Sequence, residues 1–136
     1  MRVTNHPTVL VADYSKDTRE LLKFWLAVKG FRVVEAANGQ EAIELTRAGG
    51  PDLILMALRM PVRDGFDATR CIREHVGKRD VPIVAMSTYP SMDERAAALA
   101  AGCSSFIAQP IDFSYLSNLL NLLLPEAARP SAQGIG

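Results

Sequence analysis

"LILMALRMPVRDG", residues 53–65, joins a continuous apolar run to a turn rich in proline, aspartate and glycine. The run from Leu53 to Leu58 suits a strand that is covered on both faces of a sheet. Function in an open parallel sheet collects at the carboxyl ends of the strands. Ala57 stands at that point of the run, so a bare methyl group occupies the position where a reactive side chain is expected.

Working outward, β-rich runs recur along the chain and each is followed by a helical pattern. Four of the runs are nearly continuous in apolar or small residues, whereas residues 31–36 are more mixed, which suits an edge strand. The alternation predicts right-handed crossovers and a parallel sheet between two helical layers. The predicted strands are residues 8–12, 31–36, 52–57, 82–87 and 104–108; the predicted helices lie in residues 15–30, 38–50, 65–77, 91–102 and 112–125.

The helical segments have recognisable ends. Ser15 and Asp112 are predicted to cap helix starts, and Ser91 with Glu94 has the spacing of a capping box. Trp25 is interpreted as a core anchor of the first helix. Glycine or proline ends the first, fourth and last helices, at Gly30, Gly102 and Pro125.

Composition bounds the class of protein. A length of 136 residues suits one domain, and 15 basic against 15 acidic residues argue against binding to nucleic acid or an anionic membrane. No signal peptide or membrane helix is expected. Cys71 and Cys103 are too few for a disulfide framework, and neither has nearby partners for a zinc site. We therefore expect a cytoplasmic protein with an N-terminal arm (1–6), one domain (7–124) and a disordered tail (125–136).

Five motifs in order resemble the receiver domains of bacterial two-component response regulators. The resemblance extends over about residues 7–124 and implies a flavodoxin-like, doubly wound α/β fold. In that CheY-like fold, a three-layer arrangement holds a five-stranded parallel sheet in the order 2-1-3-4-5 with five helices. The motifs are "VLVAD" (9–13), "NGQEAI" (38–43), "PDLILMALRMPVRDG" (51–65), "VPIVAMST" (81–88) and "ALAAGCSSFIAQP" (98–110).

The family transfers a phosphoryl group to an aspartate after the third strand, with Mg²⁺ held by that aspartate and an acidic pair. The resemblance puts Ala57 at the acceptor position and Asp13 with Tyr14 at the acidic pair. Ser87 matches the hydroxyl position, and Gln109 stands where the family has lysine. Aspartyl phosphorylation at residue 57 is therefore excluded, Mg²⁺ binding is expected to be weak or absent, and no residue is assigned as catalytic. Changes at three positions favour natural degeneration over an artificial substitution.

The surviving groups have simpler interpretations beside the functional one. Asp13 can hydrogen-bond the loop before the first helix, and Ser87 with Thr88 can satisfy turn amides. Asp13, Tyr14, Ser87 and Gln109 can also form neutral hydrogen bonds together. The resemblance gives Asp64 and Gly65 a role in the turn into the third helix.

The two histidines and the step from Gln109 to Pro110 have no assigned chemistry. His6 and His75 are expected to be solvated, so a hydrolase triad with Ser87 has no support. The Gln109–Pro110 step matches a family position where a cis peptide is usual.

Ser87 and Phe106 match the two switch positions of the family, in which the hydroxyl and an aromatic residue move together. The last helix has an apolar arc that is broader than packing on one side requires. The arc reflects either ordinary burial at the chain end or an interface that includes residues 95–102. Its core stripe is Leu116, Leu119, Leu120 and Leu123, and Leu122 and Leu124 widen it.

Three hypotheses follow. The first is a single-domain, receiver-like signalling protein, not an enzyme, which acts by phosphorylation-independent binding to a protein such as a histidine kinase. This hypothesis includes a homodimer through the fourth helix, fifth strand and fifth helix. The second is a conventional phosphorelay regulator with an altered acceptor, or one shifted to Asp13 or Asp64. The third is a small-ligand sensor that uses the pocket vacated at Ala57.

Overall fold

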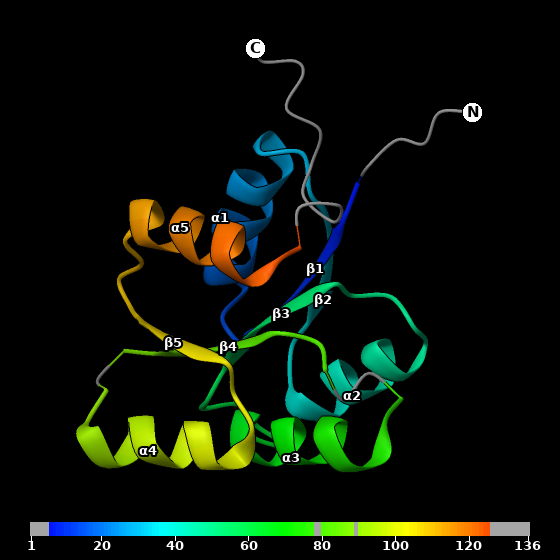
Figure 1. Cartoon of the computed structure of the whole chain (residues 1–136), viewed down its shortest axis with the longest axis vertical. Helices are drawn as coiled ribbons and strands as arrows, with labels where there is room; N and C mark the ends of the chain where they lie inside the picture. The colour runs from blue at the N-terminus through cyan, green and yellow to red at the C-terminus, as the bar shows by residue number, and fades with distance from the viewer. Residues whose placement is uncertain (1–5, 78–79, 89, 126–136) are drawn as a thin grey trace.

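The computed structural model describes residues 6–77, 80–88 and 90–125 as strands and helices in strict alternation (Figure 1). All strand pairs are parallel, and the sheet order is β2-β1-β3-β4-β5. The predicted doubly wound fold is therefore confirmed. The elements are β1 (Thr8–Ala12), α1 (Lys16–Val28), β2 (Arg32–Ala36), α2 (Gly39–Arg47), β3 (Leu53–Ala57), α3 (Gly65–His75), β4 (Ile83–Ser87), α4 (Met92–Ala101), β5 (Ser105–Ala108) and α5 (Phe113–Leu123).

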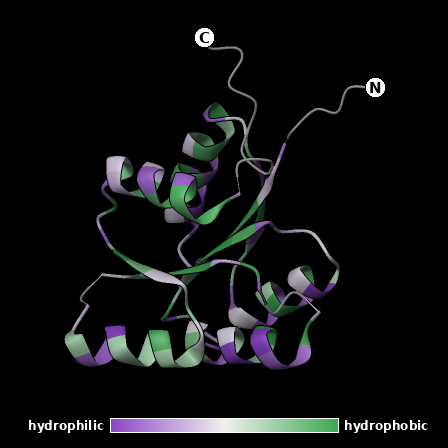
Figure 2. Ribbon diagram, viewed as in Figure 1, coloured by the Kyte–Doolittle hydropathy of each residue, from purple (hydrophilic) through white to green (hydrophobic). Residues whose placement is uncertain are grey.

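Helices cover both faces of the sheet. Figure 1 shows α1 and α5 on one face and α2, α3 and α4 on the other. Alternate residues of β3 enter the two cores: Ile54 and Met56 pack toward α2, α3 and α4, whereas Leu53, Leu55 and Ala57 pack toward α1 and α5. Figure 2 shows the strands as the hydrophobic centre of the molecule. Burial on both faces explains why β3 is a continuous apolar run.

The predicted helix caps are largely present. The side chains of Ser15 and Asp112 accept backbone amide hydrogens at the starts of α1 and α5, and Gly30 follows α1 with φ of 96°. Ser91 likewise accepts the amide of Glu94 at 3.0 Å. The capping-box prediction is nevertheless wrong for the Glu94 side chain, because its carboxylate bonds to groups outside α4.

Two core predictions need correction. Trp25 is half-buried rather than central, and its ring lies 5.0 Å from that of Phe113. Leu124 lies beyond the end of α5 at Leu123, so it does not widen the apolar arc of the helix, and its burial agrees with the alternative of ordinary burial at the chain end. Leu122 is 77% exposed. The exposed apolar surface of α5 is therefore narrower than the helical pattern predicted.

Smaller differences concern the ends of elements. β2 begins at Arg32 instead of residue 31, and α3 ends at His75 instead of residue 77. Most of the predicted N-terminal arm and all of the predicted tail after Pro125 lie outside the described residues. No helix in the described ranges has the length and apolar content needed to cross a bilayer.

Candidate functional site

A pocket of about 360 Å³ lies at the carboxyl ends of β1, β3, β4 and β5. Strand order places these ends together, because neighbouring parallel strands finish at one edge of the sheet. The structure thus brings the five predicted site positions to one place. They are Asp13, Tyr14, Ala57, Ser87 and Gln109, and Ser15, Thr18, Arg59, Met86 and Thr88 complete the lining.

Asp13 follows β1 and is the one carboxylate among the described residues that line this pocket. Its side chain is nearly inaccessible, at 6% exposure, and Oδ1 accepts the amide hydrogen of Ser15 at 2.9 Å. Burial raises the pKa of Asp13, and hydrogen bonds from Ser15 and the Gln109 side chain, with the charge of Arg19, oppose that rise. The carboxylate is therefore bonded within the protein, as the simpler interpretation of Asp13 predicted.

Ala57 places its methyl group on the pocket wall and is 6% exposed. The start of α3 approaches it closely, since an added Cβ on Gly65 would collide with the Ala57 carbonyl oxygen. Asp64 accepts the amide of Asp67 as the cap of α3, so its carboxylate is committed outside the pocket. Asp64 is not among the pocket-lining residues.

Ser87 ends β4, and its hydroxyl is turned toward α4. Ser87 Oγ donates to Glu94 Oε1 at 2.6 Å, while Arg59 Nη2 donates to Glu94 Oε2 at 2.9 Å. The Glu94 side chain is only 6% exposed. Sequence reasoning missed this contact. A signal was present, because Glu94 shares a helical stripe with Ala98 and Ala101, the other two buried residues of α4.

The remaining predicted positions are Tyr14, Gln109 and Phe106, and they differ in exposure. Tyr14 is 66% exposed, and Gln109 follows β5 before a cis peptide bond to Pro110. Phe106 is not part of the pocket lining; it is buried on the α4 side, where the Arg95 guanidinium carbon lies 4.8 Å from the ring centroid.

The two histidines, His6 and His75, are exposed, and neither lines the pocket. They are therefore not placed to act with Ser87 in a hydrolase triad.

The donor set does not fit Mg²⁺. That ion needs several hard oxygen ligands, and the pocket offers one carboxylate, which is already hydrogen-bonded. Within the described ranges, no group of three or more His, Cys, Asp or Glu side chains is arranged to hold a metal ion. At residue 57 the pocket wall holds an alanine, which has no side-chain oxygen.

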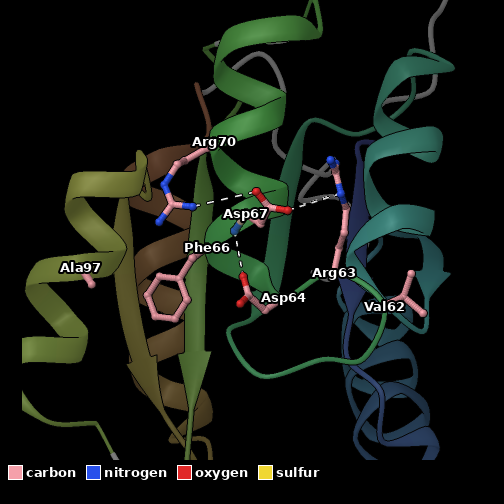
Figure 3. A pocket seen from close by; sticks show the side chains of 7 residues that line it. All are labelled: Val62, Arg63, Asp64, Phe66, Asp67, Arg70 and Ala97. Atoms are coloured by element: carbon pink, nitrogen blue, oxygen red, sulfur yellow. Dashed lines mark hydrogen bonds and ion pairs between the residues drawn. The ribbon is translucent and has the colours of Figure 1, made fainter.

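A second hollow of about 500 Å³ lies between the loop after β3, α3 and α4 (Figure 3). Asp67 lies between Arg63 and Arg70 and forms ion pairs with both, at 3.3 and 4.0 Å. Phe66 and Ala97 contribute an apolar wall. Asp64, one of the alternative acceptors, also lines this hollow, and its carboxylate accepts the amide hydrogen of Asp67.

The fold and the pocket at the strand ends define a doubly wound α/β domain with a site at its topological switch point. The model of the response regulator receiver domain matches residues 9–121. The chain therefore belongs to the receiver domain family of two-component signalling.

Two curated relatives illustrate the relationship. A 14.6 kDa protein of Leptolyngbya boryana, encoded in the sodA1 3' region, is 35% identical over 104 residues, which are 76% of this chain and 79% of that protein. The transcriptional regulatory protein PrrA of Mycobacterium tuberculosis is 33% identical over 118 residues, 87% of this chain. The matched part is 50% of PrrA, so the chain spans about half the length of that relative.

Solved structures show the same fold. Vibrio cholerae CheY4 superimposes with a TM-score of 0.82 at 26% identity, covering 88% of this chain and 99% of that one. The magnesium-bound receiver of the Pseudomonas aeruginosa sensor histidine kinase PA1611 superimposes with a TM-score of 0.81 at 30% identity. The match covers 87% of this chain and 97% of that one. The receiver of Saccharomyces cerevisiae Ssk1, solved with the phosphotransfer protein Ypd1, has 26% identity. It gives a TM-score of 0.80 and covers 90% of this chain and 91% of the matched chain.

Proposed function

We propose that this chain is a pseudo-receiver, a signalling module that binds a protein partner without aspartyl phosphorylation. The observation that carries the proposal is Ala57 at the carboxyl end of β3, on the wall of the strand-end pocket. A methyl group has no oxygen to attack phosphorus. A receiver with this residue retains the surfaces of the fold without the phosphorylated form of that position.

The rest of the pocket supports the same function. The family has a second acidic residue at the position of Tyr14 and a lysine at the position of Gln109. Compared with the family, this chain therefore lacks one negative and one positive group in the pocket. The Gln109 side chain instead opposes, through hydrogen bonding, the rise that burial causes in the pKa of Asp13. The pocket is thus internally bonded, and Mg²⁺ would lack the carboxylates that it requires.

The partner that we propose is a histidine kinase or another signalling protein of a phosphorelay, with binding in the cytoplasm. Receivers do contact such proteins, since the Ssk1 receiver is solved in complex with the histidine phosphotransfer protein Ypd1. A homodimer through α4, β5 and α5 is a further part of the proposal. Leu99 on α4, at 58% exposure, and Leu122 on α5 are the exposed leucines of these elements.

Intact-mass measurement after incubation with acetyl phosphate and Mg²⁺ tests the absence of phosphorylation. We expect no acid-labile adduct of one phosphoryl group on the natural chain. The control variant carries Tyr14→Asp, Ala57→Asp and Gln109→Lys, which together restore the family's residue types, and it is expected to gain the adduct. An adduct on the natural chain would show that Asp13, Asp64 or another group serves as acceptor.

Ala57→Asp alone separates the pseudo-receiver from a conventional regulator with one altered residue. We expect this single variant to remain poorly phosphorylated, because Tyr14 and Gln109 still deprive the site of a metal ligand and a cation. Strong Mg²⁺-dependent phosphorylation of the single variant would favour the conventional regulator.

A small-ligand sensor is a second candidate, because the pocket keeps about 360 Å³ beside Ala57. A metabolite thermal-shift screen tests it, since a ligand that binds only the folded form raises stability. A stabilising ligand whose effect is lost in Ala57→Leu would support this function, because leucine fills the space beside the β3 end. A screen without a stabilising ligand would count against it.

A further inference from the structure

Glu94 and Arg95, which are adjacent on α4, contact the two residues at the switch-like positions, Ser87 and Phe106. The carboxylate of Glu94 accepts the hydroxyl hydrogen of Ser87, with 2.6 Å between the oxygens. The guanidinium carbon of Arg95 lies 4.8 Å from the ring centroid of Phe106, which is 8% exposed. One turn of α4 therefore engages both the end of β4 and the middle of β5.

Both carboxylate oxygens of Glu94 accept hydrogen bonds from residues that line the strand-end pocket. Oε1 accepts from Ser87, and Oε2 accepts from Arg59, which follows β3 in the chain. A serine hydroxyl has one hydrogen, so its donation to Glu94 prevents donation to a ligand beside Ala57. The buried carboxylate thus joins the ends of β3 and β4 to the first turn of α4.

Because α4 buries few apolar atoms, the hydrogen bonds of Glu94 make up a large part of its buried contacts. The buried residues of α4 are Glu94, Ala98 and Ala101, so two methyl groups supply its buried apolar side chains. Each methyl adds far less hydrophobic free energy than a buried leucine. A hydrogen bond to a charged group contributes more than a neutral one, and leaving one partner buried without the other is costly. Glu94 is the one polar side chain among the three buried residues of α4.

We propose that Glu94 is an internal clamp that sets the surface of α4 and β5 in place of a phosphoryl group. The inference rests on the proposed function, in which position 57 carries no phosphoryl group. Glu94 supplies the negative oxygen that Ser87 contacts, and it does so from α4 instead of the pocket. The surface available to a partner is then fixed by a bond within the chain.

Amide hydrogen exchange by mass spectrometry on the full chain tests the clamp. Glu94→Ala removes the carboxylate, and Glu94→Gln keeps nearly the same shape but loses the charge. We expect amides of α4 to exchange roughly tenfold faster in Glu94→Ala, with a smaller increase in Glu94→Gln and in Ser87→Ala. The matched control is Asp93→Asn, which removes one exposed charge from the same helical turn and should change exchange little.

A double-mutant cycle then isolates the contact. The effects of Ser87→Ala and Glu94→Ala on α4 exchange should be clearly less than multiplicative when combined, because both substitutions remove the same hydrogen bond. Multiplicative effects, or a Glu94→Ala variant that exchanges like Asp93→Asn, would overturn the clamp. These measurements use neither Mg²⁺ nor acetyl phosphate. Exchange results that overturn the clamp would not contradict the pseudo-receiver proposal. A phosphoryl adduct on the natural chain would refute the pseudo-receiver proposal without altering the exchange result.

Discussion

Asp13 is a carboxylate that folding removes from water, and its pKa is raised from 3.8 mainly by that burial. A raised pKa means that the folded protein binds the proton more tightly than the unfolded chain does. The contribution of Asp13 to stability is therefore greatest at low pH and falls as pH rises from about 3.8 through the folded pKa. Ionised Asp13 thus lowers the free energy of unfolding at neutral pH.

Asp13→Asn should therefore stabilise the protein more at pH 7 than at pH 4, relative to the natural chain. Asparagine keeps an oxygen that can accept the amide of Ser15. Urea unfolding at the two pH values provides the measurement, and the same substitution at the exposed Asp17 controls for the change in net charge. Equal effects of Asp13→Asn at both pH values would contradict the assigned pKa shift.

Val62 has a strained backbone in the loop after β3. Its φ is 67°, it is 79% exposed, and the amide of Arg63 donates to the carbonyl oxygen of Pro61 at 2.6 Å, which closes a tight turn around it. A β-branched residue with positive φ is costly, whereas glycine adopts this conformation readily.

Val62→Gly is expected to raise the free energy of unfolding by about 1 kcal/mol, because relief of strain outweighs the added freedom of the unfolded chain. Val28→Gly is the matched control, since Val28 is also exposed but ends a helix without strain. We expect that control to lower stability by roughly 0.5 kcal/mol. Denaturant unfolding measures the free energy of unfolding of both variants. A lower value for Val62→Gly than for the natural chain would contradict the inference that Val62 is strained.

At the scale of elements, the contact between α3 and the end of β3 depends on Gly65. A Cβ there would meet the carbonyl oxygen of Ala57 and lie 2.9 Å from the Leu58 Cα. Backbone atoms cannot move aside as a flexible side chain can. The absence of a side chain at Gly65 therefore lets α3 start beside the pocket.

Gly65→Ala should lower the free energy of unfolding by about 2 kcal/mol, in the range of overpacking substitutions. Gly50→Ala is the control, because an added Cβ at that position meets nothing within 4 Å. Its effect should be close to zero. Thermal or denaturant unfolding measures both, and equal effects would show that α3 can shift without cost.

At the scale of the whole molecule, Mg²⁺ tests what the pocket retains. A ligand that binds the folded protein raises Tm, and one hydrogen-bonded carboxylate is a poor site for this ion. We expect no change in Tm in millimolar Mg²⁺ compared with a chelator. The variant with Tyr14→Asp, Ala57→Asp and Gln109→Lys should show a rise, whereas a clear rise in the natural chain would contradict the assigned donor set.

Much of the architecture was predictable because it depends on local patterns. Apolar runs at regular intervals indicated the strands, and capping residues such as Ser15 and Asp112 marked helix starts. The location of the pocket followed from the parallel sheet. The half-burial of Trp25 and the burial of Leu124 were not predictable, because each depends on where the neighbouring element ends and packs.

The amino-acid sequence by itself determined the family, the order of strands and helices, and the chemical groups at the strand ends, including the methyl group of Ala57. The tertiary structure alone decided the partners of Ser87 and Glu94. The two residues lie seven positions apart, and Arg59 lies 35 positions from Glu94. A carboxylate in a first helical turn can cap its own helix or bond elsewhere with similar local geometry. The choice is made by the groups that the assembled sheet brings within reach.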